Sequence, residues 1–444
     1  MKVGVIGCGY VGLITAVGLS SKGHKVIAID INPVRVEKLK KGIIPFHEPG
    51  VGEALKAVLN KNNLTISSKM EDISKQEVIF ICVQTPPKSN GAINLQILET
   101  AARTLAEIFS KNPILRTVVT KSTIIPGTTD QFIAPIFQKV ATRTHIAFNP
   151  EFLRESSALE DFLHPDRIVI GTHSSQASRV LRKLFATFNA PIIVTTPSTA
   201  ELSKYASNMV LATLISFSNE IAKICERTLD ADIEDVLGIV HRDRRFRSSF
   251  RGATAVGIIS YLKAGCGFGG SCFPKDLSAL IAYARSIGEE PHLLKSVATV
   301  NAGQPIRVVK MVSEAFGGLE KRKIVVLGVG FKGGTDDLRE SPGLRIVDEL
   351  LKRKALVIAY DPLVDEKNLK NYQDKGVIVA KNLKNALEIA DGCIIASNAP
   401  EFNKLNQLKK FTKKKIVIID GRRILKIPKN SKEKYYAVGL SRSN

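Results

Sequence analysis

The sequence predicts an α/β protein with two doubly wound, parallel-sheet domains joined by a long central helix. Short apolar segments alternate with helix-period segments through the first and last thirds of the chain. A glycine-rich turn follows the first apolar segment, and a looser one follows the segment 323–327. Between them, residues 200–230 contain neither glycine nor proline. They predict one helix of about thirty residues, roughly 45 Å long.

The composition favours a globular protein that binds an anionic ligand. The chain has 444 residues, of which 44% are hydrophobic, and this is enough for two or three domains. Its net charge of +22 and isoelectric point of about 9.7 suit a phosphorylated ligand or nucleic acid. Tryptophan is absent and aromatic residues make up only 6%, so stacking surfaces for single-stranded nucleic acid are poorly supplied.

Six cysteines are scattered along the chain, at positions 8, 82, 225, 266, 272 and 393. They form no CxxC pair and show no zinc-ligand spacing, so we expect free thiols and no metal site. The sequence shows neither a charged-then-apolar leader nor an apolar run long enough to cross a bilayer. These observations predict a cytoplasmic protein that does not insert into a membrane.

The start of the chain has the pattern of a dinucleotide-binding β-α-β unit. Strands are predicted at Lys2–Ile6 and Lys25–Ile29, with a helix at 13–21 between them and the turn GCGYVG before that helix. In this pattern the three glycines make the turn, admit a pyrophosphate and let the helix pack on the strand. Asp30 follows the second strand, where a carboxylate accepts from ribose hydroxyls and repels a 2′-phosphate, so we expect NAD rather than NADP. Arg35 could cover the adenine or neutralise a phosphate.

Five further strands are predicted in the first half of the chain, at 78–83, 117–120, 145–148, 168–170 and 192–194. Polar or proline-containing turns follow three of them, at 84–87, 121–128 and 149–155. Strands that alternate with helices form a parallel sheet, whose carboxyl ends lie at one edge. That edge is where α/β proteins bind their ligands.

The central helix begins with polar residues at helical spacing. Glu201, Lys204 and Asn208 recur at i, i+3 and i+4 intervals, so Lys204 and Asn208 share a face. Leu211 and Leu214 continue as part of an apolar stripe. A helix of this length exceeds what one domain needs, so we expect it to bridge two lobes and to offer a dimer face. The assembly expected is a homodimer or a higher homo-oligomer.

The segment 264–276, AGCGFGGSCFPKD, predicts a loop that presents a reactive cysteine to a ligand. Its glycines allow the backbone to lie close to that ligand. Pro274 suits the first turn of a helix, which places Cys272 near the positive end of the helix dipole. A thiol in such a position ionises more readily, and the thiolate is the nucleophile.

The last third of the chain repeats the α/β pattern. Strands are predicted at 323–327, 356–360, 393–396 and 416–419, and a helix is predicted from Ser341 to about 353. Lys332, Arg339 and Arg422 follow strand ends, where a nucleotide diphosphate would sit. Two nucleotide-type lobes and a reactive thiol imply NAD on the first lobe and a nucleotide-bearing substrate on the second.

Ordered sequence blocks along nearly the whole chain resemble the UDP-glucose 6-dehydrogenase family, within the UDP-glucose/GDP-mannose dehydrogenase group. They read GCGYVG, CVQTP, KSTIIPGT, NPEFLRES with DFLHPDRIVIG, ELSKYASN, GFGGSCFPKD, GFKGGTDDLRESP, YDP and DGR. The resemblance implies a Rossmann NAD-binding domain at 1–197 and a Rossmann-like UDP-sugar-binding domain at 311–444. It also implies a central helical, dimerisation and cysteine-loop domain at 198–310.

The resemblance further implies four-electron oxidation of UDP-glucose at C6 to UDP-glucuronate, through a thiohemiacetal and a thioester on Cys272, for polysaccharide biosynthesis. The implied catalytic residues are Cys272, Lys204, Asn208, Asp276, Glu151 and Thr123. The implied NAD contacts are Gly7, Gly9, Tyr10, Val11, Gly12, Asp30, Arg35, Thr85, Thr123, Glu155 and Arg339. The implied substrate contacts are Glu151, Phe152, Leu153, Lys204, Asn208, Arg245, Phe268, Gly269, Phe331, Lys332 and Arg422.

The family chemistry gives each catalytic residue a role. Lys204 would stabilise the developing oxyanion, and Asn208 would hold the sugar or a water. Asp276 would tune the lysine or handle a water proton, while Glu151 would act as the base for thioester hydrolysis. Thr123 would order the water.

Several alternatives stay open. Family members carry a D-x-R-I-G segment whose arginine reaches the substrate of the neighbouring subunit, and the nearest match here, at 243–246, favours Arg245. Cys266 is a candidate redox partner of Cys272. GDP-mannose and UDP-N-acetylhexosamines are alternative substrates. A two-electron alcohol dehydrogenase and a basic nucleic-acid-binding or NAD-sensing protein are alternative functions.

Overall fold

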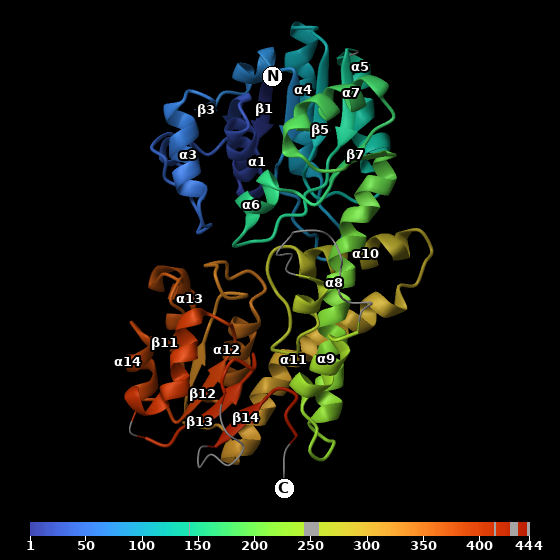
Figure 1. The fold of residues 1–444 in the computed structure, drawn as a ribbon. Coiled ribbons are helices and arrows are strands. Elements are labelled where there is room, and N and C mark those ends of the chain that lie inside the picture. Colours follow the sequence, from blue (N-terminus) through green and yellow to red (C-terminus); the bar gives the residue numbers. More distant parts are fainter. Residues whose placement is uncertain (142, 244–256, 413, 427–433, 442–444) are drawn as a thin grey trace. The chain divides into compact units, whose positions relative to one another are not determined.

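The computed structural model describes residues 1–141, 143–243, 257–412, 414–426 and 434–441 (Figure 1). The chain forms two compact units. Unit 1 comprises residues 1–207 with 278–288, and unit 2 comprises residues 208–277 with 289–444. Both are α/β units built on mostly parallel sheets, so the predicted fold class is confirmed.

Unit 1 contains an eight-stranded sheet with the order β3-β2-β1-β4-β5-β6-β7-β8. The strands are β1 Lys2–Ile6, β2 Lys25–Ile29, β3 Leu64–Ser67, β4 Val78–Ile81, β5 Arg116–Thr120, β6 Thr144–Phe148, β7 Ile168–Gly171 and β8 Ile192–Thr195. All neighbouring pairs are parallel except β6 and β7, which meet antiparallel at Phe148 and Gly171. The carboxyl ends of β1, β4, β5 and β6 therefore lie along one edge.

Helices cover both faces of this sheet (Figure 1). One apolar core joins the sheet to α1 Tyr10–Ser21, α2 Pro33–Lys40, α3 Val51–Asn60, α6 Ala158–Leu163 and α7 Ser175–Phe185. The opposite core joins it to α4 Gln96–Lys111 and α5 Ala134–Val140, which a π-helical turn at Thr129–Ile133 precedes. Short 3₁₀ segments at Met70–Lys75 and Ala186–Phe188 complete the unit.

The helix of the middle segment that begins at Phe273 lies where the sequence predicted one, whereas three further helices of this segment add to or correct the prediction. Helix α8 spans Pro197–Cys225 rather than 200–230, and the chain then turns at Asp230, whose φ is 59°. Helix α9, Ile233–Val240, follows, and α10 begins at Phe273 and ends at Ser286. The sequence analysis missed α11, His292–Phe316, because Pro305 lies inside it.

Unit 2 contains a six-stranded parallel sheet with the order β11-β10-β9-β12-β13-β14. The strands are β9 Lys323–Leu327, β10 Leu356–Tyr360, β11 Ile378–Val379, β12 Gly392–Ile395, β13 Val417–Asp420 and β14 Tyr435–Ala437. Three further helices, α12 Pro342–Lys352, α13 Lys370–Gln373 and α14 Leu383–Glu388, and 3₁₀ segments at Ile258–Tyr261, Glu366–Leu369 and Pro400–Lys410 accompany the sheet.

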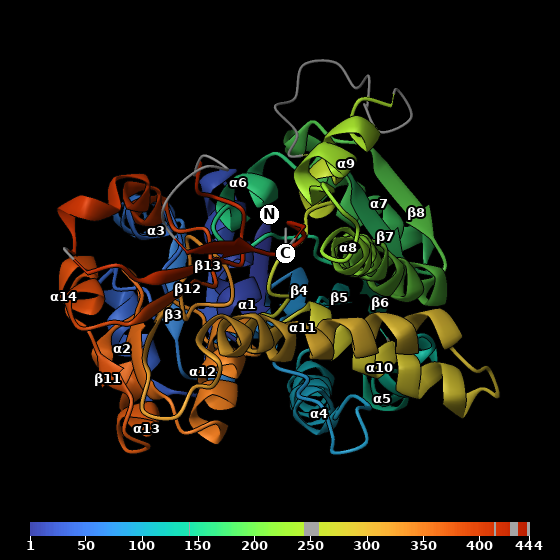
Figure 2. The same ribbon diagram turned by 90° about the horizontal axis from the view of Figure 1, so that it is seen from below.

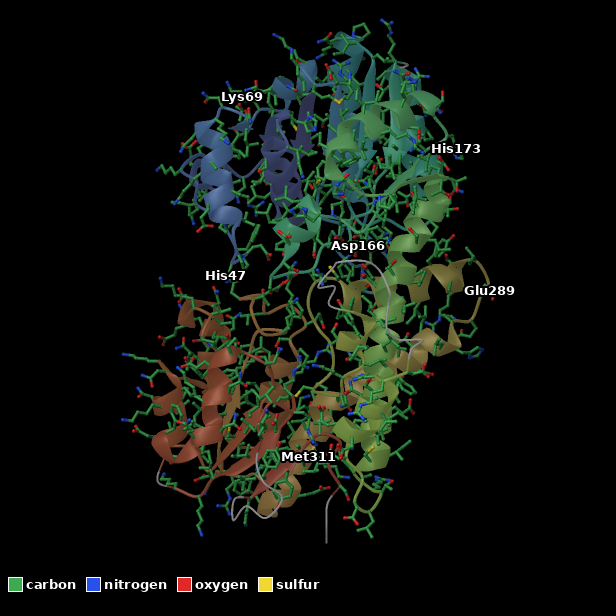
Figure 3. All side chains as sticks on the ribbon, in the orientation of Figure 1. His47, Lys69, Asp166, His173, Glu289 and Met311 are labelled. Atoms are coloured by element: carbon green, nitrogen blue, oxygen red, sulfur yellow. The ribbon has the colours of Figure 1, made fainter. Side chains whose placement is uncertain are left out.

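The sheet of unit 2 also has a core on each face. On one face it packs against α9, α11, α12 and the end of α8, and α11 lies beside α12 (Figure 2). Met311 of α11, labelled in Figure 3, is 2% exposed within this core. On the other face it packs against α14 and the 3₁₀ segment Pro400–Lys410. Among the described residues, no helix combines the length and apolarity needed to span a membrane.

Candidate functional site

The glycine turn of unit 1 leaves the N-terminus of α1 open. Gly7 turns the chain with a φ of 88°, and α1 begins directly after Gly9, which offers no side-chain cap. A Cβ on Gly9 would meet no protein atom within 4 Å, whereas one on Gly12 would lie 1.7 Å from the carbonyl oxygen of Gly7. The start of α1 is therefore open beside Gly9 and has no side-chain cap, and such a helix N-terminus fits the pyrophosphate of a dinucleotide.

The Asp30 carboxylate lies beside this turn at the end of β2. Its Oδ2 accepts hydrogen bonds from the Cys8 N–H at 2.8 Å and from Arg35 Nη1 at 2.9 Å, and its Oδ1 accepts from the Asn32 N–H at 2.9 Å. Asp30 is 5% exposed. The structure therefore places Arg35 against Asp30 and fixes the acceptor predicted for a ribose.

Glu48 is a functional candidate that the sequence analysis missed. Its buried carboxylate accepts from the Tyr10 hydroxyl at 2.5 Å and from the N–H groups of Ser156 and Ala158 at 2.8 Å each. It ties the loop after His47 (Figure 3) to the start of α6. Tyr10 and Val11 pack against the apolar core of this face of the sheet. The motif HEPG was visible in the sequence, but the backbone partners of Glu48 lie about 110 residues away.

The ends of β4 and β5 bring two predicted NAD contacts together. The Thr85 hydroxyl donates to the carbonyl oxygen of Thr123 at 2.8 Å. The Ser122 hydroxyl donates to the carbonyl oxygen of Val83 at 2.6 Å. Glu155 lies in the loop between β6 and α6 and is half-buried. The parallel register of the strands explains why residues from separate motifs meet at this edge.

Lys204 and Glu151 form a buried ion pair. The Lys204 Nζ lies 2.6 Å from Glu151 Oε1, and both side chains are at most 5% exposed. Glu151 Oε2 also accepts from the Leu153 N–H at 2.8 Å. Burial would raise the pKa of Glu151, but the Lys204 charge and these hydrogen bonds outweigh it and lower the pKa. Glu151 is therefore held ionised next to a cation.

Two further groups complete the surroundings of this pair. Lys121 donates to Asn149 Oδ1 at 2.8 Å, and burial lowers the pKa of Lys121 to about 8. The sequence analysis passed over Lys121, although it begins the motif KSTIIPGT. The ring of Phe152 lies 5.8 Å from Lys204 Nζ and 4.0 Å from the Arg167 guanidinium. Phe152 and Leu153, which the motif predicts as substrate contacts, thus lie beside the ion pair.

Cys272 occupies the N-terminus of α10 in unit 2. Its carbonyl oxygen accepts from the Asp276 N–H at 2.8 Å, which makes it the residue that opens the helix. Its Sγ lies 3.6 Å from the Ser271 hydroxyl, and the side chain is half-buried. The other five cysteines are buried and free. The position fits a nucleophile that the helix dipole supports.

The Asp276 carboxylate contacts two side chains, Asn208 of the predicted catalytic set and the neighbouring Lys275. Its Oδ2 accepts from Asn208 Nδ2 at 2.7 Å, and its Oδ1 lies 3.1 Å from Lys275 Nζ. Asp276 is 1% exposed, so both partners are needed to offset the cost of burying the charge. Sequence reasoning predicted Asn208 and Asp276 but missed Lys275, although Lys275 adjoins Asp276 in the motif.

The glycine loop packs directly on the loop that follows β9. The Gly270 N–H donates to the carbonyl oxygen of Arg339 at 3.0 Å. A Cβ on Gly269 would lie 2.2 Å from the carbonyl oxygen of Glu340, and one on Gly270 would lie 2.8 Å from the ring of Phe331. These close approaches explain why glycine is required, and they place Arg339 and Phe331 beside the cysteine loop.

The other end of the glycine loop meets Arg422. A Cβ on Gly265 would lie 2.8 Å from Arg422 Nη1. The Phe268 ring packs edge-on against Phe273, with centroids 5.8 Å apart, and Lys332 Nζ lies 5.6 Å from the Phe331 centroid. The predicted substrate residues of unit 2 thus gather around one loop.

Two predictions have other outcomes. Cys266 is fully buried, with Sγ 3.5 Å from the carbonyl oxygen of Gly421, and burial raises its pKa to about 12. No disulfide joins it to Cys272, so the structure gives Cys266 a packing role. Arg245 lies outside the described residues. Among the residues that are described, no cluster of histidine, cysteine and carboxylate side chains could hold a metal ion.

Three family models match consecutive segments of the chain. They are the NAD binding domain of the UDP-glucose/GDP-mannose dehydrogenase family at residues 1–189, its central domain at 198–303 and its UDP binding domain at 325–427.

Individual proteins show the same similarity. The chain is 37% identical to UDP-glucose 6-dehydrogenase AglM of Haloferax volcanii, covering 96% of this chain and 97% of that one. It is 40% identical to UDP-glucose 6-dehydrogenase YwqF of Bacillus subtilis, covering 90% and 88%. A UDP-glucose dehydrogenase from Pyrobaculum islandicum has a TM-score of 0.90 at 38% identity, covering 99% and 98%. A UDP-D-ManNAc dehydrogenase from Pyrococcus horikoshii has a TM-score of 0.83 at 28% identity, covering 99% of each chain.

Proposed function

The chain belongs to the UDP-glucose/GDP-mannose dehydrogenase family, and on that premise we propose that it oxidises the C6 alcohol of UDP-glucose to the carboxylate of UDP-glucuronate with NAD. The relatives named UDP-glucose 6-dehydrogenase support this substrate, since they are 36–40% identical over most of the chain. The observation that carries the chemistry is the position of Cys272 at the start of α10. Asp276 lies one helical turn later and accepts a hydrogen bond from Asn208.

Unit 1 supplies the cofactor site. The open N-terminus of α1 accommodates the pyrophosphate, and Asp30 accepts from the ribose hydroxyls. Thr85, Thr123 and Glu155 line the same sheet edge, and we assign Arg339 of unit 2 to the cofactor as well. NAD, when bound, supplies the acceptor for one electron pair in each of two successive oxidations.

The thiol of Cys272 divides the reaction into steps that each have a modest barrier. The first oxidation converts the C6 alcohol to an aldehyde, and the thiolate adds to the aldehyde carbon to form a C–S bond. The second oxidation turns this thiohemiacetal into a thioester. Water then attacks the thioester carbon, the C–S bond breaks, and the carboxylate leaves with the thiolate restored.

Five side chains manage charge and orientation during these steps. We assign the Lys204 ammonium to the developing oxyanion, because a buried cation is worth more there than in water. Glu151, which is held ionised, is the base that activates water for thioester hydrolysis. Asn208 orients the sugar or the water, and Asp276 fixes Asn208. Thr123 helps to order the water.

Unit 2 supplies the substrate site. We assign Phe331, Lys332 and Arg422 to the nucleotide, and Phe268 and Gly269 to the sugar. Glu151, Phe152, Leu153, Lys204 and Asn208 complete the substrate contacts, and Arg245 is proposed as a contact to a neighbouring subunit's substrate. No observation favours GDP-mannose or a UDP-N-acetylhexosamine over UDP-glucose. We propose three functional segments. Residues 1–197 bind NAD, residues 198–310 hold the central helix and the cysteine loop, and residues 311–444 bind the UDP-sugar.

We further propose a homodimer that uses α8. Val210, Phe217 and Ile224 recur every seven residues on this helix and are 52%, 47% and 58% exposed. An apolar stripe of this spacing is the pattern by which two helices associate. Sedimentation of the wild type should give a dimer, and Phe217→Arg should shift it toward a monomer. A wild-type monomer at micromolar concentration would exclude this assembly.

The enzymatic proposal is tested with a panel of nucleotide sugars and NAD, read as NADH absorbance. UDP-glucose should be the best substrate and should yield two NADH for each sugar consumed. One NADH per sugar would indicate a two-electron alcohol dehydrogenase instead. Salt-dependent nucleic-acid binding without turnover would favour the non-enzymatic alternative. We place the reaction in the cytoplasm, where fractionation of cells should find the protein.

A further inference from the structure

Three amide side chains reach the backbone of the glycine loop from two helices. Asn219 of α8 accepts from the Gly265 N–H through Oδ1 at 2.7 Å, and Gln304 of α11 donates from Nε2 to the Gly265 carbonyl oxygen at 2.7 Å. Asn301 of α11 accepts from the Phe268 N–H at 2.7 Å and donates to the Phe268 carbonyl oxygen at 3.0 Å. The three side chains are 0%, 0% and 7% exposed, in the order Asn219, Gln304, Asn301.

These amides form hydrogen bonds with the backbone of the loop, as a neighbouring strand does with a strand in a sheet. A buried backbone N–H or carbonyl needs a partner, and a glycine-rich segment has many conformations to choose among. A carboxamide offers one donor group and one acceptor group, so Asn301 satisfies both polar groups of Phe268. Together the amides fix the loop at Gly265 and at Phe268, a few residues before Cys272.

The same amides stand where packing alone would favour apolar residues. On α11, Val297, Val308 and Val312 line the buried face that carries Asn301 and Gln304. Among the described residues, Asn219 Nδ2 and Gln304 Oε1 are buried without a hydrogen-bond partner. Such an atom is unfavourable in a core, and an apolar residue would avoid it. Asn219 and Gln304 therefore gain less stability from their loop hydrogen bonds than Asn301, whose two polar atoms are both bonded to Phe268.

We infer that Asn219, Asn301 and Gln304 are positioning residues that set the conformation of the cysteine loop so that the Cys272 thiol captures the aldehyde before it leaves. The inference rests on the proposed function. The loop's other face packs on Phe331 and Arg422, so a shift of the loop would move the thiol and the substrate contacts together.

The test is the yield of NADH per UDP-glucose in Asn301→Leu and in Gln304→Met, with a hydroxylamine trap for free aldehyde. A displaced thiol still permits the first oxidation but not the capture. The yield should fall from two toward one, trapped aldehyde should appear, and the rate of acid formation should fall roughly 10- to 100-fold. The Kd for NAD, which unit 1 binds, should not change.

Asn382→Ala is the matched control. Asn382 caps α14 in the same unit by accepting from the Asn385 N–H at 2.8 Å, and it has no role at the loop. The substitution removes a helix cap and lowers stability but should leave the yield at two. A yield of two without aldehyde in both loop variants would overturn the inference, because a structural defect only lowers the amount of active enzyme. A wild type that does not oxidise UDP-glucose would instead overturn the proposed function.

Discussion

The two units contain the same glycine turn with different surroundings. In unit 1, Gly7 has a φ of 88°, and a Cβ on Gly12 would lie 1.7 Å from the Gly7 carbonyl oxygen. In unit 2, Gly328 has a φ of 90°, and a Cβ on Gly343 would lie 2.3 Å from the Gly328 carbonyl oxygen. Each helix thus packs on its strand through a glycine that meets the turn.

Each unit also has an aspartate directly after its second strand, and this aspartate accepts a hydrogen bond from the backbone of the glycine turn. Asp30 accepts from the Cys8 N–H at 2.8 Å, and Asp361 accepts from the Gly330 N–H at 3.0 Å. Burial raises the pKa of Asp361, although these backbone hydrogen bonds act against the rise. Turn, packing glycine and acid are therefore shared by the two units.

The segments between turn and helix differ. Gly12 comes three positions after Gly9, whereas Gly343 comes thirteen positions after Gly330. The additional residues form the loop 331–340 that contacts the cysteine loop. In addition, Ser341 caps α12 by accepting from the Leu344 N–H, while α1 has no side-chain cap. The turn of unit 1 thus leads directly into a helix without a side-chain cap, whereas a loop separates the turn of unit 2 from a capped helix.

The largest expected effect is the loss of NAD binding in Gly12→Ala. Its Cβ would collide with the backbone of Gly7, so the turn must open, and we expect the Kd for NAD to rise at least about 100-fold. Calorimetry should find UDP-glucose binding retained. Gly9→Ala is the control, because its Cβ clashes with no protein atom, so it should fold normally and still lose NAD affinity. Normal NAD binding by both variants would refute the cofactor site.

The second prediction concerns the buried charges of unit 1. The pKa of Lys121 is lowered to about 8 from 10.5, so above pH 8 the unfolded chain binds more protons at this group than the folded chain. The unfolding free energy of the wild type, relative to Lys121→Met, should therefore increase as pH rises, by about 2 kcal/mol between pH 7 and 9.5. Urea unfolding at both pH values measures this difference. A constant difference would show that Lys121 does not titrate there.

The smallest effect distinguishes the second turn from the first. Ser341→Ala removes the cap of α12 and should lower the unfolding free energy by about 1 kcal/mol. The Kd for NAD should be unchanged, because Ser341 is not among the proposed NAD contacts and its side chain is used by the Leu344 N–H. A weakened affinity for NAD in this variant would mean that the two turns are less different than their contacts indicate.

The sequence predicted the parts of this architecture that local patterns encode. The turn GCGYVG, most strands of both sheets and the loop around Cys272 follow from glycine placement and apolar periodicity. The short edge strands β3, β11 and β14 were not predicted, because two to four residues carry too little apolar pattern. The end of α8 at Cys225 was not predicted, because no glycine or proline marks it. Helix α11 was not predicted, because it contains Pro305.

The missed site residues are those whose role depends on distant partners. Glu48 binds backbone more than a hundred residues away, and Asn301 meets Phe268 only because α11 packs beneath the cysteine loop. Lys275 adjoins a predicted residue, but its pairing with Asp276 depends on side-chain direction at the start of α10. Such contacts come from tertiary packing, which periodicity does not record.

The most direct test of the account is the mass of the peptide that contains Cys272, taken from acid-quenched Glu151→Gln enzyme mixed with UDP-glucose and NAD. Slowed hydrolysis should leave Cys272 carrying a UDP-glucuronyl group as a thioester, and Cys272→Ser should carry none and form no acid. Unmodified Cys272 in an enzyme that has already formed two NADH per site would contradict the covalent mechanism.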